Sequence, residues 1–207
     1  MTALPKQGPG EKLPKLDRRE AWRAVALRVG ATFSEGKRKS QDRVDLEHGP
    51  WRIRLDTFTV YTGQVSVTYT RVGAFFTGRA DLKLMVRKRN FFDQILKKLG
   101  LGGFTPVSRR LASRYVVKGK PERRLRSVVT AGLTEALLAQ ASLKLEVKAA
   151  PRKNRKALGP RTRLVVMHVS GIVTDPDRLV GMFAVVRETL DALEGIGVAA
   201  REAVVRV

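Results

Sequence analysis

The clearest alternation of apolar and polar residues lies between Trp51 and Val86. In the run W-R-I-R-L-D, which begins at Trp51, apolar side chains occupy every second position. Similar runs begin at Val65 (V-S-V-T-Y-T) and at Leu82 (L-K-L-M-V). A period of two is typical of strands with one face buried. The residues Thr62-Gly63-Gln64 favour a hairpin turn between the first two runs, so we predict paired antiparallel strands.

The alternation changes phase inside the first run. Up to Leu55 the apolar residues have odd numbers, whereas Phe58 and Val60 have even numbers. One extra residue in a strand would produce such a shift. We therefore predict a β-bulge or a bend near Asp56-Thr57.

Helical spacing of apolar residues appears on both sides of these strands. Asp17 and Glu20 form a capping-box pattern at the start of a helix that Gly30 would end. Asp175-Pro176 is a typical helix start, with Gly195 or Gly197 at the end of that helix. Two more helices are predicted, at 90–99 and at 121–137, and shorter strands at 33–34, 43–47, 115–117, 143–147, 164–172 and 198–207.

Runs of strands with helices around them, and no regular alternation of the two, indicate an α+β fold. We predict a single domain at 16–207, a mainly antiparallel sheet with three to four helices packed largely on one face. Residues 1–15 are rich in proline, glycine and lysine and are predicted to form a mobile N-terminal tail. Residues 149–163 contain six basic and no acidic residues, which predicts an exposed basic loop between two strands.

The composition excludes several classes of function. The chain has no cysteine, so disulfides, thiolate catalysis and cysteine zinc sites are excluded. No apolar run reaches the length of a membrane span, and the first ten residues lack the apolar core of a signal peptide. These features predict a cytoplasmic protein.

The net charge of +22 is the most unusual property of the composition. A field of this sign attracts polyanions such as nucleic acid, anionic lipid or acidic proteins. Arginine outnumbers lysine by 26 to 15, as expected for a GC-rich genome, so composition bias is the competing explanation.

Half of the excess charge lies between Arg87 and Arg126, where 13 basic residues accompany only Asp93 and Glu122. We predict that this segment and the basic loop bind a polyanion, most simply nucleic acid, without sequence specificity. The chain shows no helix-turn-helix, zinc-finger, RNP or KH signature. The candidate polyanion-binding residues are Arg87, Lys88, Arg89, Lys97, Lys98, Arg109, Arg110, Arg123, Arg124, Arg126, Arg152, Lys153, Arg155 and Lys156.

Residues for catalysis are few. His48 and His168 are far apart in the sequence and share no spacing typical of metal ligands. Asp56 lies beside three threonines and upstream of Arg71, so these two residues are the candidates for a polar site. Asp56 either serves a reaction or pairs with Arg71 across the hairpin. We predict a protein that is not an enzyme and uses no metal or cofactor.

The sequence leaves two alternatives to polyanion binding. The segment Phe91–Phe104 combines an amphipathic turn and a half with basic flanks, which favours attachment to an anionic membrane surface. The alternative for its apolar residues is packing against the core. The chain could also be a structural or interaction domain without a polyanion ligand, and the sequence leaves its oligomeric state open.

The sequence of the central stretch resembles that of a known family. The motif W-x-I-x-L-D-T-F-T-V-x-T-G from Trp51, T-Y-T-R-V from Thr68 and R-K-R-N-F-F from Arg87 are similar to a family of small bacterial proteins whose function is not established. Weaker similarity extends to 22–33, 115–119 and 171–179. The resemblance implies a shared fold and implies no activity, cofactor or catalytic residue.

Overall fold

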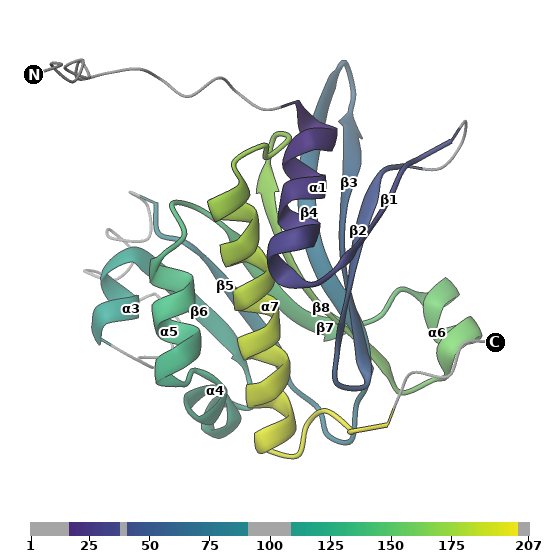
Figure 1. Ribbon diagram of the computed structural model, residues 1–207. Coiled ribbons are helices and arrows are strands. Elements are labelled where there is room, and N and C mark those ends of the chain that lie inside the picture. Colours follow the sequence, from purple (N-terminus) through teal and green to yellow (C-terminus); the bar gives the residue numbers. More distant parts are fainter. Residues whose placement is uncertain (1–16, 38–40, 91–108, 203–207) are drawn as a thin grey trace, which may run out of the picture.

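A computed structural model of the chain describes residues 17–37, 41–90 and 109–202. They form one antiparallel sheet in the order β1-β2-β3-β4-β8-β7-β5-β6 (Figure 1). The strands are β1 (Thr32–Ser34), β2 (Arg43–His48), β3 (Trp51–Thr62), β4 (Val65–Thr77), β5 (Lys83–Lys88), β6 (Tyr115–Lys120), β7 (Lys144–Ala149) and β8 (Thr162–Ser170). The prediction of an α+β fold with a mainly antiparallel sheet is confirmed.

Helices cover mainly one face of this sheet. Figure 1 shows α1, α3, α4, α5 and α7 in front of the strands. Helix α6 stands apart from them, on the other side of the molecule from α3. The helices are α1 (Arg18–Val29), α3 (Arg109–Arg114), α4 (Glu122–Val128), α5 (Ala131–Leu138), α6 (Arg152–Leu158) and α7 (Pro176–Gly195). No helix of the described ranges is both long and apolar enough to cross a membrane.

The number of helices exceeds the three to four predicted. The segment predicted as one helix at 121–137 divides into α4 and α5, because Thr130 leaves the helical conformation and caps α5 by accepting from the Leu133 amide. The basic segment predicted as a loop contains α6, and the irregular segment before β6 contains α3. Both are short helices that lack a sustained apolar stripe, so periodicity did not indicate them.

The hydrophobic core lies between the helices and one face of the sheet. Alternate strand residues such as Ile53, Val72 and Met167 are fully buried there, as the period of two predicts. Trp22 of α1 and Phe183 of α7 fill the space above them. The capping box at Asp17 and Glu20 and the cap at Asp175 are confirmed, because both aspartates accept from amides of the first helical turn.

The predicted bulge at Asp56-Thr57 is wrong. The β3–β4 pairing runs without interruption through Asp56↔Arg71, Thr57↔Thr70 and Phe58↔Tyr69. The phase of the apolar residues changes because their side chains change faces of the sheet: beyond Thr57 they lie on the face opposite the helices. The shift from odd to even positions therefore marks the point where the apolar side chains move to the other face of the sheet. It does not mark an extra residue.

Three other predictions concern segments that the structure describes only in part or not at all. In the described part of the segment 198–207 there is no strand, only a bridge between Ala199 and Gly78. The helix predicted at 90–99 falls almost entirely within 91–108, which lies outside the described residues. The tail predicted at 1–15 also lies outside them.

Candidate functional site

The face of the sheet opposite the five helices, called here the open face, carries most of the charged strand residues. In strands that lie side by side, directly paired residues point to the same side of a sheet. Arg71, His168, Lys144 and Arg87 are such partners across β4, β8, β7 and β5. They form a row of two arginines, one lysine and one histidine across four neighbouring strands, called here the basic row.

Four acidic residues of the described strands share the open face, and each is paired with a base of the same face. Asp45 binds Arg54 and Arg43, and Glu146 binds Lys144 and Lys148. Glu47 pairs with Arg52, and Asp56 with Arg71. Because two of the acids each serve two cations, the face keeps an excess of positive charge.

Helix α6 adds four cations to the side of this face. Arg152, Lys153, Arg155 and Lys156 are all exposed, and none of them forms an ion pair within the described residues. The helix buries no residue, so its side chains are free to turn toward a ligand.

A cavity of about 850 Å³ lies between α6 and the open face. Phe75, Leu164 and Val166 contribute to an apolar floor, and Leu158 of α6 lies at one wall. The other wall is polar and consists of Glu47, Arg52, Arg54, Asp56 and Arg71. A volume of this size falls in the range typical of ligand sites.

Asp56 and Arg71, the residues of the predicted polar site, meet at this wall. The Arg71 Nε and Nη2 atoms donate to the two carboxylate oxygens of Asp56 at 2.7 and 2.6 Å. This is the pairing across the hairpin that the sequence offered as one of two alternatives. Both carboxylate oxygens are occupied, so Asp56 acts as the counter-charge that fixes the orientation of Arg71.

An aromatic cluster adjoins Arg71 on the same face. The rings of Phe58 and Tyr69 are stacked with centroids 5.1 Å apart, and His168 contacts both rings edge-on. The guanidinium of Arg71 lies 5.1 Å from the Phe58 centroid, in cation–π geometry. Burial, with the charges of Lys144, Lys148 and Arg71, lowers the pKa of His168, and Glu146 opposes this only in part. His168 is therefore neutral at pH 7.

The structure separates the sequence-predicted polyanion-binding residues. Arg87 and Lys88 belong to β5, while Arg109, Arg110, Arg123, Arg124 and Arg126 belong to α3 and α4 on the helix side. Figure 1 shows α3 and α4 across the molecule from α6. Lys97 and Lys98 lie outside the described residues, as does nearly all of the membrane segment predicted at Phe91–Phe104.

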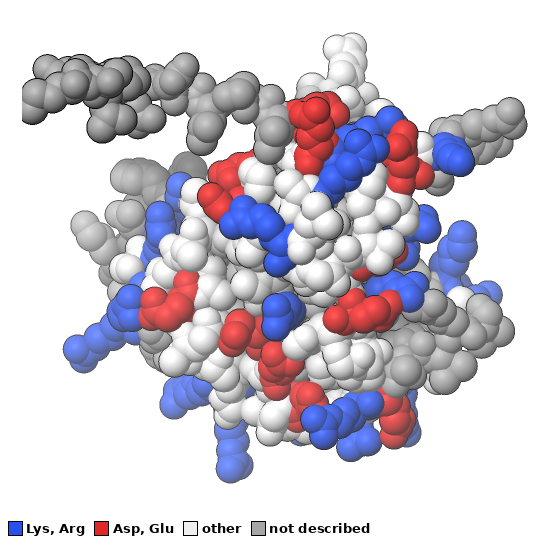
Figure 2. All heavy atoms as spheres, viewed as in Figure 1, with Lys and Arg blue, Asp and Glu red and all other residues white. Residues whose placement is uncertain are grey.

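Several cations on the helix side are already paired. Arg110 binds Glu135, Arg126 binds Glu122, and Arg124 donates to the Asp81 carbonyl at 2.9 Å. Figure 2 shows acidic and basic side chains alternating over the visible helix side. Acidic side chains among the basic ones weaken the attraction of this side for a polyanion.

Sequence reasoning missed several basic residues of strands β3 and β7. Arg52, Arg54, Lys144 and Lys148 are separated in the sequence by apolar residues, so none belongs to a basic run. Their common signal was available, because each occupies the polar phase of an alternating strand. A search for charge along that phase, instead of along the chain, would have found them.

The other histidine, His48, lies apart from this face. His48 Nε2 lies 2.7 Å from Asp191 Oδ1, on the helix side of the sheet. The two histidines are thus on opposite faces. Among the described residues no group of three or more His, Cys, Asp or Glu is arranged to hold a metal ion.

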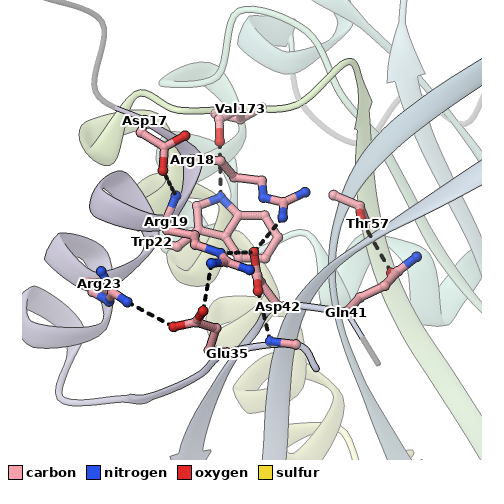
Figure 3. Close-up of polar contacts among 11 residues, drawn as sticks. Asp17, Arg18, Arg19, Trp22, Arg23, Glu35, Gln41, Asp42, Thr57 and Val173 are labelled. Carbon is pink, nitrogen blue, oxygen red and sulfur yellow. Dashed lines mark hydrogen bonds and ion pairs between the residues drawn. The ribbon is translucent and has the colours of Figure 1, made fainter. Parts of the chain in front are cut away.

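Asp42 is an acidic residue that sequence reasoning did not single out, and it is almost fully buried. Figure 3 shows its carboxylate at the start of α1, where it accepts from the Gly36 amide at 2.8 Å and from Arg18 and Arg19. Burial alone would raise the pKa of Asp42, but the Gly36 amide and the two guanidinium groups outweigh burial and lower it. The ionised carboxylate therefore fastens α1 to the segment before β2.

Replacing Asp42 with asparagine is expected to lower the free energy of unfolding by about 1–3 kcal/mol at pH 7. Because the folded-state pKa is depressed, this contribution is present above the unfolded value and is lost as the pH falls through the folded-state pKa. The difference between wild type and variant should thus shrink in acid. Urea unfolding at neutral and acidic pH measures it, with Glu202→Gln, an exposed partner of Arg79, as the control expected to change stability by less than about 0.5 kcal/mol.

Comparisons with known proteins add one similarity of fold. No protein-family model and no curated protein sequence matches the chain, so the family resemblance noted in the sequence stays a prediction. Among solved structures, the crystal structure of the mycobacterial trehalose monomycolate transport factor A, TtfA, is similar with a TM-score of 0.48. The alignment has 9% sequence identity and covers 85% of this chain and 94% of that one. A likeness at this level says nothing about activity.

Proposed function

We propose that this domain is a non-enzymatic binding module for an anionic polymer, nucleic acid foremost, and that the open face and α6 form its binding surface. The observation that supports this proposal best is the distribution of charge. Each acid of the open face is matched by a base of the same face, and α6 then adds four exposed cations. The four cations of α6 thus add to the positive charge of the open face.

The cavity supports the same proposal by its shape. Arg52, Arg54 and Arg71 stand on the sheet side of it, and Arg152, Lys153, Arg155 and Lys156 belong to the helix on its other side. On the α6 side the cavity is lined by Pro151, Asn154 and Leu158. An extended anionic chain would therefore meet the three arginines of the sheet inside the cavity and the cations of α6 outside it. Contacts of this kind neutralise phosphates without reading bases, which fits the sequence-independent binding predicted from composition.

Titration with labelled DNA at increasing salt tests the proposal. We expect measurable binding at about 50 mM salt and a loss of about 10²-fold or more by about 200 mM, as for a protein that contacts several phosphates. Fluorescence anisotropy measures both. Absence of binding at the lowest salt, or an affinity that does not respond to salt, would contradict the proposal.

The competing explanation, charge from composition bias, makes a different prediction. If the protein has no dedicated binding surface, removing basic residues should weaken binding equally on every side of the molecule. A dedicated open face makes the loss depend on which side of the molecule is changed. Matched substitutions on the two sides therefore separate the explanations.

A further inference from the structure

The open face is apolar where the β3–β4 hairpin extends beyond the basic row. The cross-strand pairs Phe58↔Tyr69 and Val60↔Val67 follow the pair Asp56↔Arg71 along the two strands. Residues two apart on a strand point the same way, so all four apolar side chains lie on the open face. Val60 is 42% and Val67 is 37% exposed. These four residues are called here the apolar strip.

The opposite face of the same hairpin is mainly polar, although it also carries the exposed Tyr61. Thr59 and Thr68 are hydrogen-bonded across it at 3.0 Å, and Tyr61 is paired with Ser66. Phe58, Val60, Val67 and Tyr69 thus gather on the open face, whereas Tyr61 stands among polar residues on the other face. The strip is therefore a surface feature of the open face, and water covers part of it at a cost in free energy.

The apolar strip and the basic row are neighbours on one surface. Each level of this surface is a set of paired residues across the strands, and the level of Phe58 and Tyr69 follows that of Arg71. Successive levels on a strand are about 6.6 Å apart. Arg71 and His168 join them, since Arg71 lies over the Phe58 ring and His168 contacts Phe58 and Tyr69. A ligand that spans both would place apolar groups on the strip and negative charge beside Arg71, Lys144 and Arg87.

We infer that the open face binds single-stranded nucleic acid in preference to duplex. The bases pack against Phe58, Tyr69 and the two valines, and the phosphates contact the basic row and α6. Only an unpaired strand offers base faces to a protein, because a duplex hides them in its own stack. An antiparallel sheet with partly exposed aromatic residues such as Phe58 and Tyr69, beside cations, suits such a strand. This inference rests on the proposed function and names the class of polyanion.

Three probes test the inference: a single strand of about 20 nucleotides, the matching duplex, and an abasic strand of the same length. The wild-type protein should bind the single strand at least about tenfold more tightly than either of the other two. The double variant F58A/Y69A should lose about tenfold or more in affinity for the single strand. Its affinity for the abasic strand should stay within about twofold, since phosphate contacts remain.

Two further variants keep the test decisive. Tyr61→Ala removes an aromatic side chain that is 79% exposed on the other face of the hairpin, so it should leave binding unchanged. F58L/Y69L retains apolar bulk if the alanine variant fails to fold, and it should still lose preference for the single strand. Circular dichroism establishes folding in each case.

The outcomes separate this inference from the proposed function. If no probe binds, the proposed function fails and the inference fails with it. If all three probes bind equally and the aromatic variants change nothing, binding to a polyanion stands and the single-strand inference is overturned. If the variants instead abolish binding to anionic phosphatidylglycerol vesicles while the strands do not bind, the surface is for lipid and the inference is wrong.

Discussion

Replacing Arg152, Lys153, Arg155 and Lys156 of α6 with alanine is expected to weaken DNA binding about 100-fold at about 50 mM salt. A cation that reaches a phosphate raises affinity by roughly a factor of ten at that salt, and about two of the four side chains are expected to reach phosphates at once. The slope of log affinity against log salt should become shallower by about two. Anisotropy titrations at several salt concentrations measure both quantities.

The same number of charges can be removed from the other side of the molecule as a control. Alanine at Arg109, Arg110, Arg123 and Arg126 leaves the open face and α6 intact. Arg110 and Arg126 already have acidic partners, so we expect less than about a threefold loss. A larger loss from this control than from the α6 variant would place the binding surface on the helix side. Equal losses would favour composition bias.

Neither set of substitutions should unfold the protein. α6 buries none of its residues, and the four residues of the control are exposed. Exposed changes of this kind usually alter the free energy of unfolding by less than about 0.5 kcal/mol each. A change in affinity can therefore be assigned to the surface that was altered.

Trp22→Ala is expected to have the largest effect on stability, a loss of about 3–5 kcal/mol in the free energy of unfolding. Trp22 is fully buried, and its indole Nε1 donates to the Val173 carbonyl at 3.2 Å. Figure 3 shows this bond joining α1 to the segment before α7. The substitution removes the side chain from the core and leaves the Val173 carbonyl without that partner. Urea unfolding followed by circular dichroism measures the loss.

Leu27 of the same helix provides the matched control. It is 85% exposed, so Leu27→Ala should change the free energy of unfolding by less than about 0.5 kcal/mol. A loss of less than about 1 kcal/mol for Trp22→Ala would mean that α1 contributes little to the packed core. In that case the Asp42 variant should also be nearly neutral, because both act by holding α1 in place.

Local sequence signals predicted much of the fold. The capping box at Asp17 and Glu20, the start at Asp175-Pro176 and the turn at Gly63 involve residues close together in the chain. Each depends on the hydrogen bonds of one turn or on the positive φ of one glycine. Such features are decided before the chain is packed, and the sequence therefore predicts them well.

The candidate site was predicted in part. Asp56 and Arg71 were identified as a pair because the hairpin register places them opposite each other. The basic residues were identified as runs along the chain, and the structure divides those runs between the two sides of the sheet. The cavity could not be predicted at all, since it forms between β3, β4, β8 and a helix that follows β7.

Sequence by itself determined the strand alternation, the helix caps, the absence of cysteine and the net charge of +22. Only the tertiary structure decided where that charge lies. The order β4-β8-β7-β5 aligns Arg71, His168, Lys144 and Arg87, although the first and the third are more than 70 residues apart. Register between strands depends on which faces can bury their apolar residues against the helices, and that choice involves the whole chain at once.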